Sequence, residues 1–357
     1  MPALILFLIL LFQAPACAQE KSDSTRHHSL VRETVRNFDR FDTNFIEPQH
    51  YVFTVMLQAT HTYDIFTLRS AGDDAQSITF SPDMNLKLGP FVGWKWFFAG
   101  YTFELGNINL SRIKQQLDLS IYSSQIGIDL FYRRTGNDYK LRDARLGANV
   151  DTQVLERQSF SGIKAGITGF NVYYIFNHRR FSYPAAFAQS TQQKVSCGSW
   201  MAGMGYTRNS LDVDHAQLQR LIDERMGINT VPLDSGLMIN NVSYNDFNVS
   251  GGYAYNWVFK KNWLFAASLQ GALCYKKSVG DAVGIKEGFD FKNVNLDGIG
   301  RFGVVYNNMR WYAGASIIVH TNNYHKPRFR TNNTFGSMNM YVGYNFGLKK
   351  KYRKQKN

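Results

Sequence analysis

The amino-acid sequence predicts an all-β protein, an antiparallel transmembrane β-barrel of about 12 strands (range 10–14), with a short helix in one outer loop. Apolar and polar residues alternate with period two over many segments, as in strands between two different surroundings. Aromatic residues make up 15% of the chain, although the mean hydropathy is −0.30. Because a barrel exposes only every second residue to lipid, a negative mean hydropathy does not oppose a membrane location.

The stretch 244–276 has the clearest pattern. From Phe247 to Phe259 the odd positions are mostly aromatic or aliphatic, and the even positions are small or polar. After a turn at 260–262 the alternation resumes, with Leu269 in the outward set and Gln270 in the inward set. Aromatic residues crowd both sides of the turn, as at a membrane–water interface. This hairpin sets the pattern for the rest of the chain.

The other strands are assigned by the same alternation. In 78–88 we expect Ile78 and Phe80 to face lipid, with a bulge or bend at Pro82, which lacks a ladder donor. The phase flips at 123–124, which indicates a hairpin turn. The expected strands are about 51–60, 78–88, 92–98, 117–121, 125–133, 159–176, 195–207, 244–259, 263–275, 295–306, 310–320 and 334–347.

The lengths of the connections predict the orientation of the barrel, because bacterial barrels keep short turns at the periplasmic end and long loops outside. Short and long connections alternate if 177–194 is one irregular periplasmic excursion, which suits its Tyr183-Pro184-Ala185-Ala186 stretch. Both termini are then periplasmic. We expect short turns at 89–90, 123–124, 260–261 and 307–309, and long connections at 64–76, 104–113, 135–158, 208–243, 277–294 and 321–333.

One long connection, 208–243, carries a helical pattern. Asp214 and Gln217 have the spacing of a capping box, and Leu218, Leu221, Ile222 and Met226 share one helical face before Gly227. A helix packed on the barrel rim is favoured over a lid or gate.

The chain divides into four segments: 1–18 a signal peptide, 19–50 a periplasmic leader, 51–348 the barrel and 349–357 a basic tail. The apolar run 3–12 is shorter than the ~20 residues of a spanning helix and precedes the small-x-small pattern Ala16-Cys17-Ala18. We therefore expect export to a bacterial outer membrane. A lipoprotein anchored at Cys17 is a weaker alternative, because Ala14 stands where an aliphatic residue is expected.

The net charge is +13, and the tail holds six basic residues and no acid. A solvated tail is favoured over contact with anionic lipid or an acidic partner. Cys197 and Cys274 belong to strand ends at opposite heights, so we expect both to be unpaired.

The sequence holds no recognisable catalytic constellation. Its eight histidines lack zinc-ligand spacing, and no phosphate loop or nucleophile elbow is present, so no cofactor and no metal is expected. Ser316 and His320 share the inward face of one strand but lie roughly 13 Å apart along it. A non-enzymatic role is favoured.

Charged residues in the inward sets form the candidate site. They line a pore or solute site, or they pair with one another in a narrow interior, and equal numbers of acids and bases favour pairing. These lumen-facing candidates are Asp83, Lys87, Lys95, Asp118, Asp129, Arg133, Lys164, Asp246, Asp297 and Arg301.

Four segments resemble one known family: 41–46 (FDTNFI), 128–134 (IDLFYRR), 181–187 (FSYPAAF) and 196–199 (SCGS). They are similar to the uncharacterised domain-of-unknown-function family 4421, and the resemblance covers about 38–347. It implies an outer-membrane barrel protein without an assigned activity, and it supplies no catalytic residue.

The leading functional hypothesis is a small channel or solute-binding barrel. The alternatives are a non-conducting structural or surface-interaction barrel and, third, a lipid-acting enzyme. The expected partners are outer-membrane lipid and, for a channel, a small solute, but not nucleic acid. The sequence does not indicate the oligomeric state.

Overall fold

The computed structural model describes the following ranges: 41–71, 75–83, 85–94, 97–100, 103–104, 115–134, 139–148, 150–227, 231–238, 241–278, 293–326 and 329–353. The expected signal peptide and residues 19–40 of the expected leader lie outside them. No helix within these ranges is long and apolar enough to cross a membrane.

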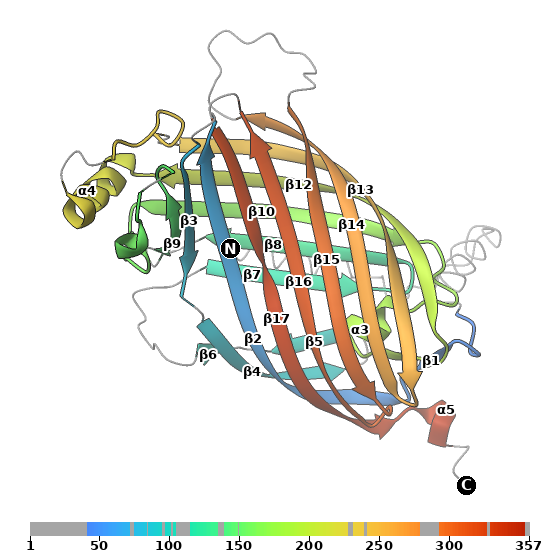
Figure 1. Ribbon diagram of the computed structural model, residues 1–357. Coiled ribbons are helices and arrows are strands. Elements are labelled where there is room, and N and C mark those ends of the chain that lie inside the picture. The colour runs from blue at the N-terminus through green and yellow to red at the C-terminus, as the bar shows by residue number, and fades with distance from the viewer. Residues whose placement is uncertain are drawn as a thin grey trace, which may run out of the picture. The chain divides into compact units, whose positions relative to one another are not determined.

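The structure is an antiparallel β-barrel, as the sequence predicts (Figure 1). Twelve strands follow one another along the sheet in the order β5-β4-β2-β17-β16-β15-β14-β13-β12-β10-β8-β7, and β3, β6 and β9 pair beside this path. The first long strand, β2, pairs with the last, β17. In the described residues no pairing joins the two end strands, β5 and β7.

The strands of the barrel have the following bounds: β2 (Tyr51–Ser70), β3 (Ser77–Pro82), β4 (Asn85–Trp94), β5 (Phe97–Gly100), β6 (Phe103–Glu104), β7 (Gln115–Tyr122), β8 (Ile126–Arg134), β9 (Tyr139–Arg145), β10 (Ile163–Ile175), β12 (Cys197–Val213), β13 (Asn241–Lys260), β14 (Trp263–Ser278), β15 (Val294–Asn307), β16 (Trp311–His325) and β17 (Phe329–Leu348). A separate two-stranded sheet joins β1 (Ile46–Pro48) to β11 (Thr191–Gln193). The helices are η1 (Gln153–Leu155), α3 (Tyr183–Phe187), α4 (His215–Met226) and α5 (Lys350–Arg353).

The period-two pattern places the side chains as expected. Along β13, Val249 is 69% exposed and the adjacent Ser250 is 8% exposed. Exposed apolar side chains form a band around the outside, which ends in aromatic rows. In the upper row, Tyr206 contacts Phe170 and Phe247, with ring centroids 6.5 and 4.9 Å away. From Phe247 to Phe259 the band is roughly 30 Å tall at ~3.3 Å per residue and ~40° tilt, which matches a bilayer core.

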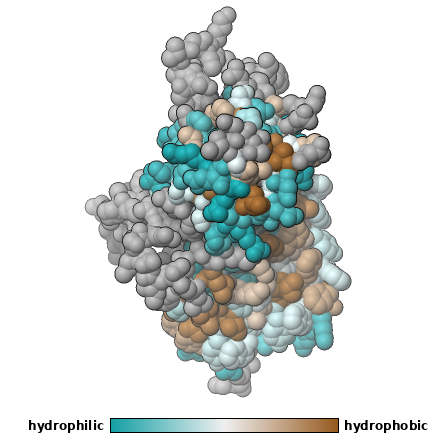
Figure 2. Space-filling model, turned by 60° about the vertical axis from the view of Figure 1, so that its left-hand side comes forward, coloured by the Kyte–Doolittle hydropathy of each residue, from teal (hydrophilic) through white to brown (hydrophobic). Residues whose placement is uncertain are grey.

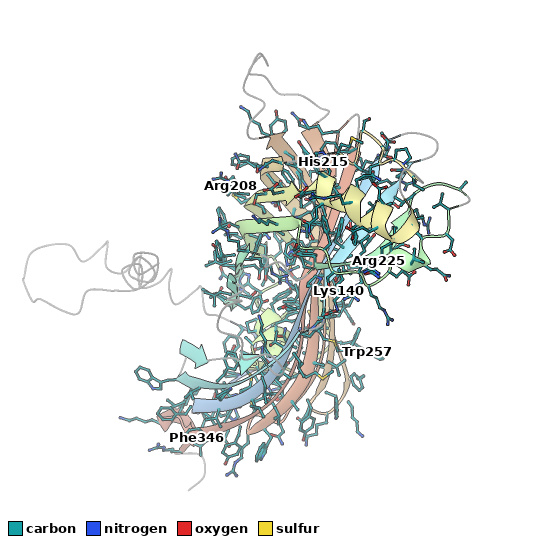
Figure 3. All side chains as sticks on the ribbon, turned by 90° about the vertical axis from the view of Figure 1, so that its left-hand side faces the viewer. Lys140, Arg208, His215, Arg225, Trp257 and Phe346 are labelled. Atoms are coloured by element: carbon teal, nitrogen blue, oxygen red, sulfur yellow. The ribbon has the colours of Figure 1, made fainter. Side chains whose placement is uncertain are left out.

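The same division is visible on the surface. On the face shown in Figure 2, hydrophobic side chains gather mainly in the lower half and hydrophilic ones mainly above them. Figure 3 places Trp257 and Phe346 in this lower part, and Arg208 and His215 in the upper part. The lower part of the barrel is therefore the transmembrane part.

The expected turn at Gly89–Pro90 is wrong, because β4 runs through it from Asn85 to Trp94. The alternation does not change phase there: Leu86 and Val92 are both exposed on the outer face, and Gly89 between them is buried. A two-residue hairpin turn changes the phase, as at Ser123–Ser124, where β7 and β8 do form a hairpin.

The expected strand 78–88 is instead two strands, β3 and β4, since β3 ends at Pro82. Ile78 and Phe80 are 1% and 0% exposed, so they do not face lipid as predicted. They belong to an apolar core in the upper part of the barrel, beneath β3, β9, η1 and α4. Proline cannot donate to the ladder, which explains the end of β3 at this position.

The strands extend further upward than the alternation predicted. The strand β2 reaches Ser70, β16 ends at His325, and β17 begins at Phe329. The expected long connections 64–76 and 321–333 are therefore wrong, because most of their residues lie in these strands. Twenty-residue strands such as β2, β13 and β17 exceed the height of a bilayer core, so their upper ends project beyond it. On β2 and β13 apolar side chains such as Leu68 and Val242 point inward there.

The predicted loop helix is confirmed as α4. The Asp214 carboxylate accepts a 2.8 Å hydrogen bond from the backbone N–H of Gln217 and caps the helix. The Gln217 side chain does not complete the capping box but donates to Ser161 Oγ at 3.0 Å. Leu218 and Ile222 are fully buried in the upper core, so the helix packs on the rim as expected.

We predict that tolerance of charge on the outer face depends on depth. Leu269 is 62% exposed at mid-height of the band, and Val294 is 39% exposed beside the upper aromatic row. Leu269→Arg should lower the free energy of unfolding by about 2–4 kcal/mol and Val294→Arg by about 0–1 kcal/mol. Urea unfolding in phospholipid vesicles measures both. Equal losses for the two variants would contradict the assigned depth.

Candidate functional site in the barrel lumen

The lower end of the lumen is occupied by a segment that the sequence did not place there. Residues 177–194, expected as an irregular periplasmic excursion, contain α3, whose residues from Tyr183 to Ala186 are buried inside the barrel. The Ser182 side chain caps this helix by accepting from the Ala185 N–H, and Pro184 in its first turn needs no backbone donor. Ala185 and Ala186 pack against the inward faces of β14 and β15. We call residues 182–193 the plug.

Polar side chains fasten the plug to the wall. Tyr183 donates to Ser268 Oγ on β14 at 3.2 Å, and Gln189 hydrogen-bonds the Tyr341 hydroxyl on β17. Asn256 on β13 donates to the Ser182 carbonyl at 2.8 Å. The plug is thus held from three strands.

Gln193 joins the plug, the wall and the leader. Its side-chain carbonyl accepts from the Ser182 N–H at 2.8 Å, and its side-chain amide donates to the carbonyls of Arg180 at 2.7 Å and Phe45 at 3.2 Å. Ile46, which follows Phe45, is also the register partner of Gln193 in the β1–β11 sheet. The end of the leader is therefore tied directly to the plug.

Above the plug, one ion pair crosses the lumen. Arg301 on β15 bonds the Asp129 carboxylate on β8, and their side chains are 0% and 7% exposed. Ser120 Oγ donates to the same carboxylate at 2.7 Å, and the Arg301 guanidinium lies 5.1 Å from the Tyr173 ring centroid. The separation of β8 and β15 in the sheet order means that this pair links opposite walls.

A second charge cluster lies higher on β13, β14 and β15. The Lys276 ammonium is 2.7 Å from the Asp297 carboxylate, 3.5 Å from the Asp246 carboxylate and 2.7 Å from the Asn323 carbonyl. Asp297 also accepts from the Asn323 N–H at 2.7 Å and from the Cys274 thiol at 3.1 Å. This one lysine lies between two carboxylates with no exposure to solvent.

This second cluster also contains the ligand types of a metal site. The ligand atoms of Asp246, Cys274 and Asp297 lie within 4.8 Å of one another. Lys276 already supplies a positive charge among them, and an additional divalent cation would meet its ammonium group. The arrangement is that of a buried salt bridge.

A third group surrounds Arg133 on β8. Its guanidinium donates to the carbonyls of Tyr63 and Gly336 at 3.3 and 3.2 Å, and it lies 5.0 Å from the Phe335 ring centroid. The His320 ring stacks on the same Phe335 ring, with the two ring centroids 5.0 Å apart. His320 forms no hydrogen bond to Ser316 within the described part of the chain, which agrees with their predicted separation.

Five of the predicted lumen residues are buried in the lumen, in the three groups described above. Asp129, Arg133, Asp246, Asp297 and Arg301 are all buried in the lumen. Lys87 lies on the inward face of β4, as its alternation with the exposed Leu86 indicates.

Two of the predicted placements are wrong. Asp83 follows the last residue of β3, so the alternation of that strand does not apply to it. Its exposed carboxylate forms ion pairs with Lys140 at 2.5 Å and Arg142 at 3.1 Å. The hydrogen bond from Lys140 lowers the pKa of Asp83. Lys164 is exposed on the outer face of β10, because Ile163 and Ala165 on either side of it point inward. Lys95 and the Asp118 side chain lie outside the described structure.

Sequence reasoning missed Lys276 and Asp64. Lys276 lies one residue beyond the expected strand 263–275, although its even number belongs to the inward set of β14. Asp64 lies beyond the expected end of the first strand at residue 60, and Tyr139 donates to its buried carboxylate at 2.9 Å. Extending each alternation by a few residues would have found both.

Little space is left beside these groups. A cavity of about 20 Å³ lies next to Asp246, Asp297 and His320, which is room for about one water molecule. A second cavity, of about 70 Å³, lies at the lower end between Gln189 and Tyr312. The described lumen is therefore packed around the plug and these charged groups, whereas inward residues farther along the wall, such as Gln58 and Asn339, are half-buried.

Comparison with known families supports the resemblance seen in the sequence. A family model described as a domain of unknown function, DUF4421, matches residues 40–346. The chain belongs to this family. The match spans β1 to β17 and so includes the plug and every lumen group described above. No curated protein matches the DUF4421 chain at a significant level.

Solved structures with some similarity to the DUF4421 chain are outer-membrane proteins. The Escherichia coli outer membrane protease OmpT is 8% identical with a TM-score of 0.35, covering 85% of this chain and all of its own. The Pseudomonas putida toluene transporter TodX is 9% identical, with a TM-score of 0.26 and coverages of 84% and 91%. OprG from Pseudomonas aeruginosa is 9% identical with a TM-score of 0.24, and the match covers 85% of this chain and 99% of OprG. Similarity at this level assigns neither a site nor an activity.

We predict that the Asp129–Arg301 pair is strongly coupled. Asp129→Asn or Arg301→Met alone leaves a buried charge without its partner and should lower the free energy of unfolding by about 3–5 kcal/mol. The double variant should lose much less than the sum of the two. Urea unfolding of the three variants in micelles measures the coupling. Additive losses would mean that water, not the partner, solvates each group.

We also predict that the hydrogen bonds of the Gln193 side chain keep the plug in place in the lumen. Cys197 packs in the apolar cluster around Tyr183, so its thiol reports on the plug. With Cys17 and Cys274 replaced by Ser, Gln193→Ala should raise the labelling rate of Cys197 by a water-soluble maleimide severalfold. Gln219→Ala, which loosens only contacts of α4, is the control. Equal rates in all three proteins would show that Gln193 does not retain the plug.

Proposed function

We propose that this DUF4421 protein is a bacterial outer-membrane β-barrel that does not conduct. The observation that carries this is the Asp129–Arg301 pair, which crosses the lumen with both groups buried above a packed plug. An open pore would solvate these charges separately and would not require their pairing. The packing therefore favours the structural or surface-interaction alternative over the small channel or solute-binding barrel that led from sequence.

The outer-membrane location is supported by features of the barrel itself. The exposed band has bilayer height and aromatic borders, and the turns at the plug end, such as 261–262, are short. The other end carries α4 and the upper core, which is the end that bacterial barrels present outside the cell. Membrane lipid is the partner that this surface fits.

Conductance in planar bilayers tests the closed lumen. Wild-type protein should show no stable channel. A variant in which residues 183–188 are replaced by Gly and Ser and Asp129 and Arg301 by Ser should conduct, because both barriers are removed. This variant also shows that the assay detects inserted barrels. Large, stable conductance of the wild type would refute the proposal.

A gated channel is the second candidate, favoured by the pairing of β1 with β11. Because the leader is joined to the plug, a force on the leader would act on the plug first. Deleting residues 41–49 would then produce conductance in an otherwise wild-type barrel, whereas a permanently closed barrel would remain silent.

A lipid-acting enzyme is the least supported candidate. His320 has aromatic neighbours, Phe131 and Phe335, and no described hydrogen bond to a nucleophile. Hydrolysis of a phospholipid by purified protein would revive it.

A further inference from the structure

A groove on the outside of the barrel is not explained by a closed lumen. It has a volume of about 420 Å³ and lies across the upper ends of β8, β10, β12 and β13. Its outward-facing residues include Arg134, Lys164, Gly166, Ser210 and Asp212.

The strand register explains why a groove forms at this place. Gly166 on β10 is the cross-strand partner of Arg134 on β8 and of Ser210 on β12. Gly166 has no side chain, and a Cβ built there would lie 2.7 Å from Ser210 Oγ. The Ser210 hydroxyl therefore lies against Gly166, to whose carbonyl it donates at 3.5 Å, on the floor of the groove.

Two cationic side chains line the groove and a third lies beside it. Arg134 is directly beside Gly166, and Lys164 is two residues above it on the same face of β10. Arg208 is the partner of Thr168, which places it diagonally across from Gly166 at roughly 7–8 Å. Figure 3 shows Arg208 at the outer edge of the upper strands.

These cations have little charge compensation. Arg134, Lys164 and Arg208 are exposed, and within the described residues none of them forms an ion pair. Asp212, the register partner of Lys164, is the one acid that lines the groove in the described structure. Three cations and one carboxylate leave a net positive site with a serine hydroxyl beside it.

The height of the groove indicates its ligand. Directly below the cations lies the upper aromatic row with Phe170 and Tyr206. Below that lies an apolar row with the exposed Met204 and the half-buried Val172. The cations therefore stand just above the upper border of the apolar band, where lipid headgroups lie.

We propose that this groove binds the phosphate group of an anionic lipid of the outer leaflet. Arg134, Lys164 and Arg208 contact the phosphate oxygens, and the acyl chains lie along Phe170 and Met204. The Ser210 hydroxyl turns from its long hydrogen bond with the Gly166 carbonyl and donates to the phosphate. Guanidinium and ammonium groups are the side chains that bind phosphate most strongly. An amphiphile uses both the charged groove and the apolar column beneath it, whereas a free anion uses only the groove. The inference rests on the proposed outer-membrane location.

Native mass spectrometry of full-length protein in neutral detergent tests the proposal. The probe is diphosphorylated lipid A, compared with dephosphorylated lipid A and with inorganic phosphate. Wild-type protein should retain diphosphorylated lipid A at least tenfold more tightly than either comparison ligand. The triple variant Arg134→Gln, Lys164→Gln, Arg208→Gln should lose this preference.

Two further variants separate the site from general charge effects. Gly166→Leu fills the groove without changing any charge and should weaken lipid binding as strongly as loss of a cation. Arg225→Gln removes an exposed cation from α4, away from the groove (Figure 3), and should bind like the wild type. Circular dichroism confirms that each variant is folded.

Several outcomes would overturn the proposal. Equal binding by the wild type and the triple variant would exclude the groove. Equal retention of inorganic phosphate, or of dephosphorylated lipid A, would exclude a lipid phosphate as the ligand. Conductance by the wild-type barrel would refute the closed lumen and leave the lipid result unchanged, so the two proposals fail separately.

Discussion

The contact on which the interior depends is the ion pair between Asp129 and Arg301. A barrel of this width leaves a space that small wall residues do not fill, and this pair spans it between distant strands. Both charges have left water, so each is stable only while the other holds its place. The tyrosines around Arg301 and the plug beneath them exclude the water that would otherwise separate the pair. The packing of the tyrosines and the plug and the burial of the ion pair thus depend on each other.

The packing around this pair uses large residues set against the smallest. Tyr173 lies over Gly127, where a Cβ would come within 2.2 Å of its ring, and Tyr312 lies over Gly343 in the same way. Each glycine gives a tyrosine room to lie flat along the wall and fill the interior near the bottom of the barrel. Higher up, the filling changes to Leu68, Val242 and their neighbours, beyond the bilayer core. The buried charges and the apolar plug share the lumen within the membrane, and the largest apolar core lies above it.

The sequence predicted the local part of this architecture and missed the long-range part. Alternation depends only on neighbours along the chain, so it identified the inward position of Asp129 and Arg301 and the hairpin at Ser123–Ser124. The same rule misplaced Asp83, because it was applied beyond the end of β3, which is one residue earlier at Pro82. The plug could not be found this way. Tyr183 and Ala186 are buried by strands distant in sequence, and no local pattern records that burial.

The first and last long strands of the barrel lie side by side, because β2 and β17 pair along nearly their whole length. The end of the leader, which precedes β2 in the chain, is joined to the plug by the β1–β11 pairing and by the hydrogen bond from Gln193 to the Phe45 carbonyl. Because Gln193 also bonds Asn256 on the wall through its side-chain carbonyl, the leader cannot move without breaking contacts of the plug. The hydrogen bonds that Gln193 makes at the lower end are therefore the ones that a force on the leader would reach first.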